Sequence, residues 1–367
     1  MINKNLFKIV ILLINKIFDL EKKAVDRELK IYFRKLKRKK EDILFRDFLS
    51  EYEIFILNKR AKRLHPILLI EAFNGIINPM YLEEQVKEIR KVSMSIEFLH
   101  NAHVIQDDLI DDDTHRRGKY TFHKQIKKEI KNLYKNEEAP EIFKNWEQYG
   151  KDIGLLGGTY GYLLGLDIIR SSNFPQKLKL MAISEYTEAM DSLIRGQIIE
   201  EYMEYHHITM SLEQYLNIAE MERARVFDKA VSIGAILANG NLHYQIKPLS
   251  DAMLKIGQAY SIKDDIIDIK EDIEAKKKKI IYILAVKNTN EEQSKILNEI
   301  YRKDEISLEE INQIIQIFEE TNAVKIAEQL AKNLVSEAKT ALLEIYPDLN
   351  KGQKHFFNNF AEYTFNQ

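Results

Sequence analysis

Residues 96–118 read IEFLHNAHVIQDDLIDDDTHRRG, an apolar stretch with helical spacing that runs into five aspartates within seven positions and then two arginines. Two carboxylates one helical turn apart repel each other by about 3 kcal/mol at an effective dielectric constant of roughly 20. Such a cluster is either an acidic helix face in solvent or the seat of a strongly positive group. The rest of the sequence has to distinguish these two interpretations.

The composition favours an all-α protein. Among 367 residues there are only 13 glycines and 6 prolines, and a chain with few helix breakers and many good helix formers is typically helical. From residue 41 onward, apolar residues recur at spacings of three and four, and no run alternates with period two for long. We therefore expect helices throughout and no substantial strands.

The net charge and the cysteine content limit the classes of function that the protein can have. The formal net charge is −2, which argues against a general nucleic-acid binder. The absence of cysteine excludes disulfides, thiolate zinc sites and cysteine nucleophiles, and it fits a reducing compartment. We expect a cytoplasmic protein, with an organelle location or membrane association through residues 1–40 as the alternative.

The N-terminal 40 residues form an amphipathic and basic extension. The stretch FKIVILLINKIF holds only six uninterrupted apolar residues, at positions 9–14, whereas about 20 are needed to span a bilayer. The following LKIYFRKLKRKK interleaves basic and apolar residues. We expect an amphipathic helix packed on the body or on a partner, with targeting or membrane-surface attachment as the alternative.

The remainder, residues 41–367, is expected to form a single domain. No repeat of 20–50 residues is apparent. The polar stretch 124–149 is interpreted as a surface insertion rather than a linker.

The aspartate pattern occurs twice, as DDLID at 107–111 and as DDIID at 264–268. In a helix, Asp107 and Asp111 stand about 6 Å apart along the axis on one face, and Asp264 and Asp268 repeat this arrangement. If the two helices face each other in a bundle, four to six carboxylates converge. Hard oxygen ligands of this kind suit Mg²⁺, which binds through one or two carboxylates and substrate phosphates.

Other metal and phosphate sites fit poorly. An EF-hand that began at Asp107 would need glutamate at its twelfth position, where Gly118 stands. A di-iron bundle needs paired Glu-x-x-His motifs, and only residues 97–100 supply one. The sequence has no GxxxxGK[ST] phosphate loop. The glycines of residues 154–165 recur at helical spacing, which predicts tight helix packing.

Basic residues accompany the first aspartate cluster. Arg116, Arg117 and Lys119 follow it, and Lys62 and Arg63 lie upstream before an expected helix start. Diphosphates need guanidinium partners as well as metal, because the arginine fork binds phosphate oxygens bidentately. Two aspartate motifs at the ends of apolar helices, one of them followed by RRG, make a merely solvated acidic face improbable.

These motifs resemble those of the all-trans isoprenyl diphosphate synthases, the farnesyl and geranylgeranyl diphosphate synthase family. The resemblance covers roughly residues 50–345. The opening stretch resembles the first aspartate-rich motif through RRG, and GQAYSIKDDIID resembles the second. AKRLHP at 61–66 is similar to the family's G-K-R-x-R-P, and RGQIIE at 195–200 to its G-Q-x-x-D.

The resemblance implies a fold, a reaction and a set of site residues. The fold would be a helical bundle around a deep central cavity, and the reaction a head-to-tail condensation of isopentenyl diphosphate with dimethylallyl, geranyl or farnesyl diphosphate. Loss of the allylic diphosphate would create a carbocation that the isopentenyl double bond attacks. The implied catalytic residues are Asp107, Asp108, Asp111, Asp264, Asp265 and Asp268.

Magnesium, as three ions with diphosphate bound, would be held by Asp107, Asp111 and Asp264. Substrate binding is implied for Lys62, Arg63, His65, His100, Arg116, Arg117, Gln197 and Lys279; among these, Lys62, His65, His100 and Arg117 would position isopentenyl diphosphate, and Arg116 would assist with the allylic diphosphate. The resemblance also implies a homodimer and inhibition by bisphosphonates.

Several positions depart from the family pattern. His65 replaces the second arginine of the upstream motif, so that one phosphate contact becomes dependent on pH. Other departures also lie near the expected diphosphates: Gly158 for an aspartate, Glu200 for an aspartate, Glu222-Arg223 for Lys-Thr, and Ser261 for a glutamine. The loop after Asp268 is shortened, which makes Lys279 a provisional counterpart of the family's lysine. These changes raise the alternative of a catalytically weakened regulatory subunit.

The expected product length and a second alternative function depend on the same motifs. In the family, the residues four and five positions before the first motif form the bottom of the elongation pocket, and here these are His103 and Ala102. The small Ala102 predicts geranylgeranyl diphosphate with some farnesyl diphosphate, although a small residue also fits tight packing. A class I terpene cyclase is the less favoured alternative, because DDIID stands where a cyclase carries an N-S-E type motif.

Overall fold

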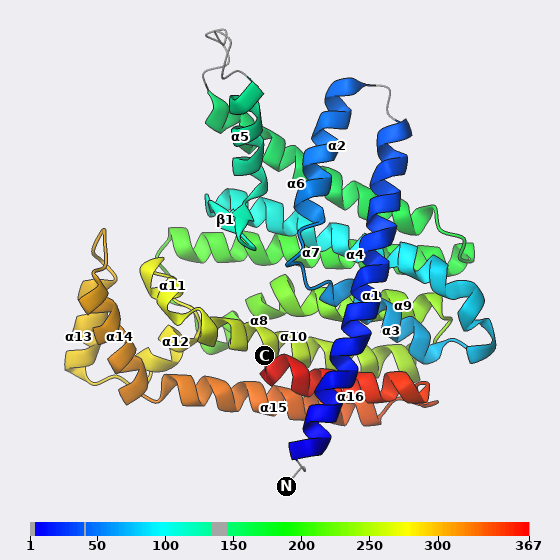
Figure 1. The fold of residues 1–367 in the computed structure, drawn as a ribbon. Coiled ribbons are helices and arrows are strands. Elements are labelled where there is room, and N and C mark those ends of the chain that lie inside the picture. Colours follow the sequence, from blue (N-terminus) through cyan, green and yellow to red (C-terminus); the bar gives the residue numbers. More distant parts are fainter. Residues whose placement is uncertain (1–3, 40–41, 134–144, 367) are drawn as a thin grey trace. The chain divides into compact units, whose positions relative to one another are not determined.

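The computed structural model describes residues 4–39, 42–133 and 145–366, and they divide into two compact units. Unit 1 comprises residues up to 190 together with 230–241, and unit 2 comprises residues 191–229 and 242–367. Most of the described residues are helical (Figure 1), and the only strands among them are two of two residues each. The prediction of an all-α fold is confirmed, and the deep central cavity stays a prediction.

The elements of unit 1 begin with a long N-terminal helix, drawn in dark blue in Figure 1. In chain order they are α1 (Lys4–Lys39), α2 (Ile43–Ile56), α3 (Leu64–Ile76), α4 (Pro79–Ile110), β1 (His115–Arg116), β2 (Lys119–Tyr120), α5 (Phe122–Leu133) and α6 (Trp146–Arg170). Helices α7 (Gln176–Tyr205) and α9 (Arg225–Leu237) each contribute residues to both units.

Unit 2 contains the remaining elements, among which α15 and α16 lie side by side (Figure 1). They are α8 (Leu212–Ala219), the π-helix η2 (Glu220–Ala224), the π-helix η3 (Leu242–Ile246), α10 (Lys247–Ile267), α11 (Ile269–Glu274), α12 (Ile280–Val286), α13 (Glu291–Ile300), α14 (Leu308–Glu320), α15 (Ala323–Leu343) and α16 (Lys351–Asn366).

Local signals in the sequence explain several helix starts. Asn78 caps α4 by accepting a hydrogen bond from the Met80 amide, and Pro79 occupies the first turn, where its missing N–H costs nothing. Ser211, Asn290 and Ser307 form capping boxes at the starts of α8, α13 and α14. The long α4 is thereby fixed at its start and carries the first aspartate motif at its end.

Helix α1 packs onto unit 1 through an apolar face. Val25, Leu29 and Phe33 are fully buried in a core that also contains Tyr52 of α2 and Phe98 of α4. The rings of Tyr52 and Phe98 stack with centroids 6.4 Å apart. The expected amphipathic helix therefore covers the body of its own unit along this stretch. None of the described helices combines the length and apolar character needed to cross a membrane.

The closely packed pair α4 and α6 explains the glycine pattern. A side chain at Gly158 would approach Gln106 Cγ to 2.7 Å, and one at Gly161 would approach the Ala102 methyl group to 2.9 Å. Only glycine permits so close an approach of two helix backbones. The prediction that these glycines serve helix packing is confirmed.

Residues 124–133 of the expected surface insertion belong to α5, which packs on α6 and buries Ile126. Residues 134–144 of that stretch lie outside the described residues.

Candidate active site

The first aspartate motif occupies the last turn of α4. Asp111 caps the helix, the side chain of Asp107 is about one-third exposed, and Asp108 is fully buried. Arg116 faces this cluster: it pairs closely with Asp108, and its Nη2 lies 3.4 Å from Asp107 Oδ2 and 3.4 Å from Asp113 Oδ2. Burial raises the pKa of Asp108 to about 7, although Arg116 opposes this effect. The cluster thus combines three solvent-accessible carboxylates, those of Asp107, Asp111 and Asp113, with one guanidinium.

A two-residue hairpin delivers the arginines of RRG to their places. His115 pairs with Tyr120 and Arg116 with Lys119, and the two residues between them, Arg117 and Gly118, both have positive φ. This is the pattern of a type I′ turn. A Cβ at Gly118 would overlap the guanidinium of Arg60. The glycine of RRG is therefore favoured by the positive φ of the turn, and a larger residue would also displace the Arg60 side chain.

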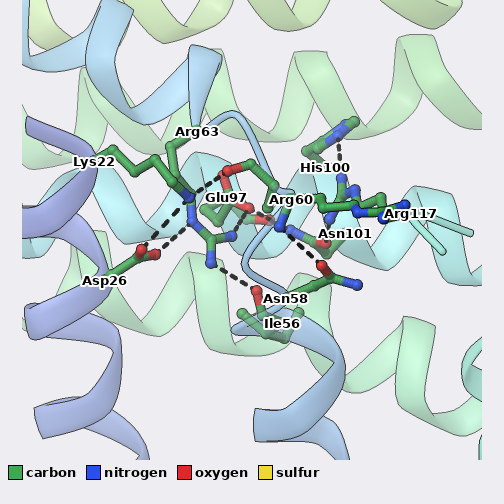
Figure 2. Close-up of polar contacts among 11 residues, drawn as sticks. Lys22, Asp26, Ile56, Asn58, Arg60, Arg63, Glu97, His100, Asn101 and Arg117 are labelled. Atoms are coloured by element: carbon green, nitrogen blue, oxygen red, sulfur yellow. Dashed lines mark hydrogen bonds and ion pairs between the residues drawn. The ribbon is translucent and has the colours of Figure 1, made fainter. Parts of the chain in front are cut away.

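The second arginine of the motif turns toward a different part of unit 1. Arg117 Nη1 donates to Asn101 Oδ1 at 3.2 Å, and its Nη2 lies 3.5 Å from His100 Nε2 (Figure 2). Because a guanidinium has only donors, the facing nitrogen of His100 acts as the acceptor and the ring is neutral. The rings of His65 and His100 lie 4.7 Å apart. Three predicted substrate-binding residues therefore meet here.

His65 is buried, and His100 beside it is partly buried. Burial lowers the pKa of His65 to about 4, with Arg117 acting in the same direction and Glu97 opposing it. Burial, His65 and Arg117 together lower the pKa of His100 well below its usual value. At neutral pH this part of unit 1 therefore presents uncharged imidazoles beside the cation of Arg117.

We expect the stability of unit 1 to fall below neutral pH because of His65. An unfolded histidine titrates near pH 6.5, so between that pH and about pH 4 only the unfolded state binds the proton. The contribution of neutral His65 to the free energy of unfolding is therefore fully present above about pH 6.5 and is lost as the pH falls toward about 4. Thermal melting from pH 7.5 to 4.5 should show a shallower decline for His65→Gln than for the wild type.

The exposed His355 provides the control for this measurement. His355→Gln should follow the wild-type profile. If His65→Gln also follows it, His65 is not held in the neutral state by the fold.

Arg63, also expected to bind substrate, is the centre of a buried network. Its guanidinium pairs with Glu97, donates to the Ile56 carbonyl at 2.7 Å and reaches Asp26 of α1 at 2.8 Å (Figure 2). The side chain is fully buried. Although burial opposes it, Arg63 and Arg117 lower the pKa of Glu97, which is therefore ionised. The donors of Arg63 are thus directed at protein acceptors, whereas its neighbour Lys62 is exposed.

The second aspartate motif lies at the end of α10 in unit 2. Asp264 Oδ2 accepts from Arg223 Nη1 at 2.8 Å, Asp265 Oδ2 accepts from the Tyr215 hydroxyl at 2.7 Å, and Asp268 caps the helix. Arg223 belongs to the π-helix η2, and such distortions are frequent at functional sites. Arg223 therefore brings a positive charge to the second motif.

Lys279 and Glu200 form a close ion pair in unit 2, beside Glu222. Although burial opposes it, Lys279 lowers the pKa of Glu200, while burial and Glu200 raise the pKa of Glu222 well above its usual value. The expected substrate ligand Gln197 donates to Glu201 at 3.2 Å.

Two residues have a packing explanation in unit 1. An aspartate at Gly158 would collide with Gln106 on α4, so this departure follows from the close approach of α4 and α6. Ala102 is fully buried with its methyl group against Gly161. The tight packing considered for Ala102 is therefore present, and His103, the other expected pocket residue, is partly exposed.

The carboxylates fit magnesium better than a metal that needs a complete protein cage. Within the described ranges, no group of three or more histidine, aspartate or glutamate side chains is arranged to hold a metal ion by itself. Magnesium commonly uses one or two carboxylates and completes its octahedron with water and phosphate oxygens. The accessible Asp107 and Asp264 supply ligands of that kind.

Comparison with known proteins identifies the family. The sequence model of the polyprenyl synthetase family matches residues 47–318. The chain belongs to the polyprenyl synthetase family. As a polyprenyl synthetase it is a prenyltransferase, and the resemblance to isoprenyl diphosphate synthases is confirmed.

Curated relatives and solved structures agree with this assignment. The polyprenyl synthetase is 26% identical over 308 residues, 80% of each chain, to the short chain isoprenyl diphosphate synthase of Methanocaldococcus jannaschii. It is 23% identical over 329 residues, 86% of this chain and 89% of the relative, to the geranylgeranyl diphosphate synthase of Saccharolobus solfataricus. A similar fold occurs in a geranylgeranyl pyrophosphate synthase from Corynebacterium glutamicum complexed with isoprenyl diphosphate and magnesium, with a TM-score of 0.83, 20% identity, and coverage of 95% and 99% of the two chains.

Several residues of the polyprenyl synthetase enter the site without a signal in the sequence analysis. Tyr215, which binds Asp265, lies in an ordinary amphipathic helix. Asn101 and Asp26 become connected to Arg117 and Arg63 only through tertiary contacts. A lone tyrosine, asparagine or aspartate carries no spacing that could have marked it.

Proposed function

We propose that this polyprenyl synthetase condenses isopentenyl diphosphate with dimethylallyl, geranyl and farnesyl diphosphates to give geranylgeranyl diphosphate together with farnesyl diphosphate. The observation that carries the proposal is the division of RRG, in which Arg116 faces the first aspartates and Arg117 faces His100. Two adjacent cations directed at two different places suit a reaction with two diphosphate substrates. The names of curated relatives, among them geranylgeranyl and farnesyl diphosphate synthases, support the same substrate class.

On the allylic side, we assign Asp107, Asp111 and Asp264 as the ligands of Mg²⁺, with three ions bound when diphosphate is present. When bound, Mg²⁺ would supply Lewis-acid stabilisation of the charge that accumulates on the leaving diphosphate. Arg116 would bind the same diphosphate with its fork of N–H donors. The other expected ligands of this side are Lys279 and Gln197, and Asp108, Asp265 and Asp268 would orient the residues around them.

On the isopentenyl side, Lys62, His65, His100 and Arg117 would hold the second diphosphate. Arg117 is the permanent cation, and the two neutral imidazoles offer donors without repelling it. Orientation is the main catalytic contribution here, because a positioned double bond attacks the allylic carbon without a protein nucleophile.

The product length is proposed from the small Ala102 and the partly exposed His103. Ala102→Phe would test this assignment, but it would also disturb the contact with Gly161, so the product length of the wild type is measured first. A homodimer is proposed from Leu155, Leu156 and Leu163, which are 54–60% exposed along α6. Light scattering after gel filtration tests the dimer, and a monomeric mass would refute it.

The direct test is turnover. Purified protein would be incubated with Mg²⁺, labelled isopentenyl diphosphate and each allylic primer in turn, and the products separated by chain length. A C20 diphosphate, with or without C15, is expected, and a bisphosphonate should raise the melting temperature only when Mg²⁺ is present.

Other outcomes favour the alternatives. Metal-dependent substrate binding without any product would indicate a regulatory subunit, and a hydrocarbon product would indicate a terpene cyclase. The ion pair between Arg223 and Asp264 favours catalysis over the regulatory role, because the altered Glu222-Arg223 still brings a cation to the second motif.

A further inference from the structure

Helix α1 contacts the loop that carries Lys62 at two points. Lys22 Nζ donates to the Ala61 carbonyl at 2.5 Å, and Asp26 Oδ1 accepts from Arg63 Nε at 2.8 Å. Lys22 and Asp26 stand one turn apart on α1, with Nζ and Oδ2 separated by 3.5 Å. The two contacts thus fall on the residues immediately before and after Lys62.

The backbone of this loop depends on such contacts. Arg63 has φ 59° and ψ 34°, in the left-handed region, and no side chain caps the start of α3 that follows. A residue other than glycine adopts this conformation at a cost of about 1 kcal/mol or more, so tertiary contacts have to hold it. Ala61 and Arg63 are buried, whereas Lys62 between them is exposed. The position of Lys62 is therefore set by its two anchored neighbours.

The same contacts continue from α1 to Arg117. Arg63 binds Glu97, whose Oε1 accepts from Asn101 Nδ2 at 2.7 Å, and Asn101 Oδ1 accepts from Arg117 at 3.2 Å (Figure 2). Arg116 turns instead to the aspartates of α4. Helix α1 is thus connected to Lys62 through the loop and to Arg117 through the network.

We propose that Lys22 and Asp26 are positioning residues for the diphosphate of isopentenyl diphosphate, and that α1 is in this way part of the substrate site. The proposal rests on the function proposed above and adds to it, because the family match begins at residue 47 and α1 lies before it. Neither residue touches the substrate. Each acts through the backbone or guanidinium of a residue next to Lys62.

Steady-state kinetics with the full chain tests the proposal. Asp26→Ala and Lys22→Met should each raise the KM for isopentenyl diphosphate by about tenfold, the scale expected when a binding group is displaced by less than 1 Å. The KM for the allylic substrate should change by less than about twofold, because the aspartate motifs are not anchored by these contacts. Asp26→Glu should restore most of the wild-type KM, since it keeps the carboxylate.

The matched control is Glu21→Gln. Glu21 also joins α1 to the body, through Arg90 of α4 at 2.8 Å, but it does not contact the loop. The Glu21→Gln variant should lower the melting temperature as much as Asp26→Ala and leave the KM values for both substrates unchanged. With an active wild type, three results would each overturn the inference. The first is an equal increase of the two KM values in Asp26→Ala and Lys22→Met, and the second is an unchanged KM for isopentenyl diphosphate in both variants. The third is the same increase of that KM in Glu21→Gln. An inactive wild type would overturn both the inference and the proposed function.

Discussion

Asp107→Ala is expected to lower kcat/KM by about a thousandfold or more. The substitution removes a proposed magnesium ligand that is accessible at the end of α4. Metal stabilisation of a leaving diphosphate is worth several kcal/mol, and about 4 kcal/mol corresponds to a thousandfold in rate. The measurement is the rate of product formation at saturating Mg²⁺, with single-turnover kinetics to separate chemistry from product release.

Asp112→Asn provides a control within the same acidic run. Asp112 is more than half exposed and pairs with Lys124 and Lys151, each at 3.1 Å, away from Arg116. Its φ of 54° is one that asparagine tolerates. We expect kcat/KM within about twofold of the wild type. An Asp107→Ala variant that keeps more than a tenth of the wild-type activity would exclude Asp107 as a metal ligand.

The helical fold and the residues of both aspartate motifs could be predicted from the sequence because their signals are local. Apolar spacing fixes the buried faces of helices such as α4, and the recurrence of DDxxD marks the two clusters. The packing role of the glycines of α6 could also be predicted, since glycines at a helix contact recur at helical spacing in the sequence. In each case a short stretch contains all the information that the prediction needs.

The tertiary contacts between the side chains of these elements could not be predicted from the sequence. The family resemblance assigns Arg116 and Arg117 to different substrates, but RRG alone does not show how the chain separates them, because this depends on the positive φ values of a two-residue turn. Arg63 looked equivalent to Lys62 as a substrate ligand, yet burial directs it to Asp26 and Glu97, 37 and 34 residues away in the chain. Such roles are decided by long-range burial, which a local motif does not encode.

Glu97→Ala is expected to cause a large loss of stability in unit 1. The side chain of Glu97 is 2% exposed, and it pairs with the fully buried Arg63. Removing one partner of a buried ion pair costs about 3–5 kcal/mol, because the other charge is left in a poorly solvated place. Arg117, which also stabilises the Glu97 carboxylate, would lose a favourable charge as well. Thermal unfolding followed by circular dichroism should show a midpoint lowered by about 10 °C.

The exposed ion pair between Asp167 and Arg170 in unit 1 gives the contrast. Its two side chains are at least half exposed, so Asp167→Asn should change the stability by less than about 1 kcal/mol. If Glu97→Ala melts within 2–3 °C of Asp167→Asn, a shift that corresponds to about 1 kcal/mol, the buried network does not stabilise unit 1.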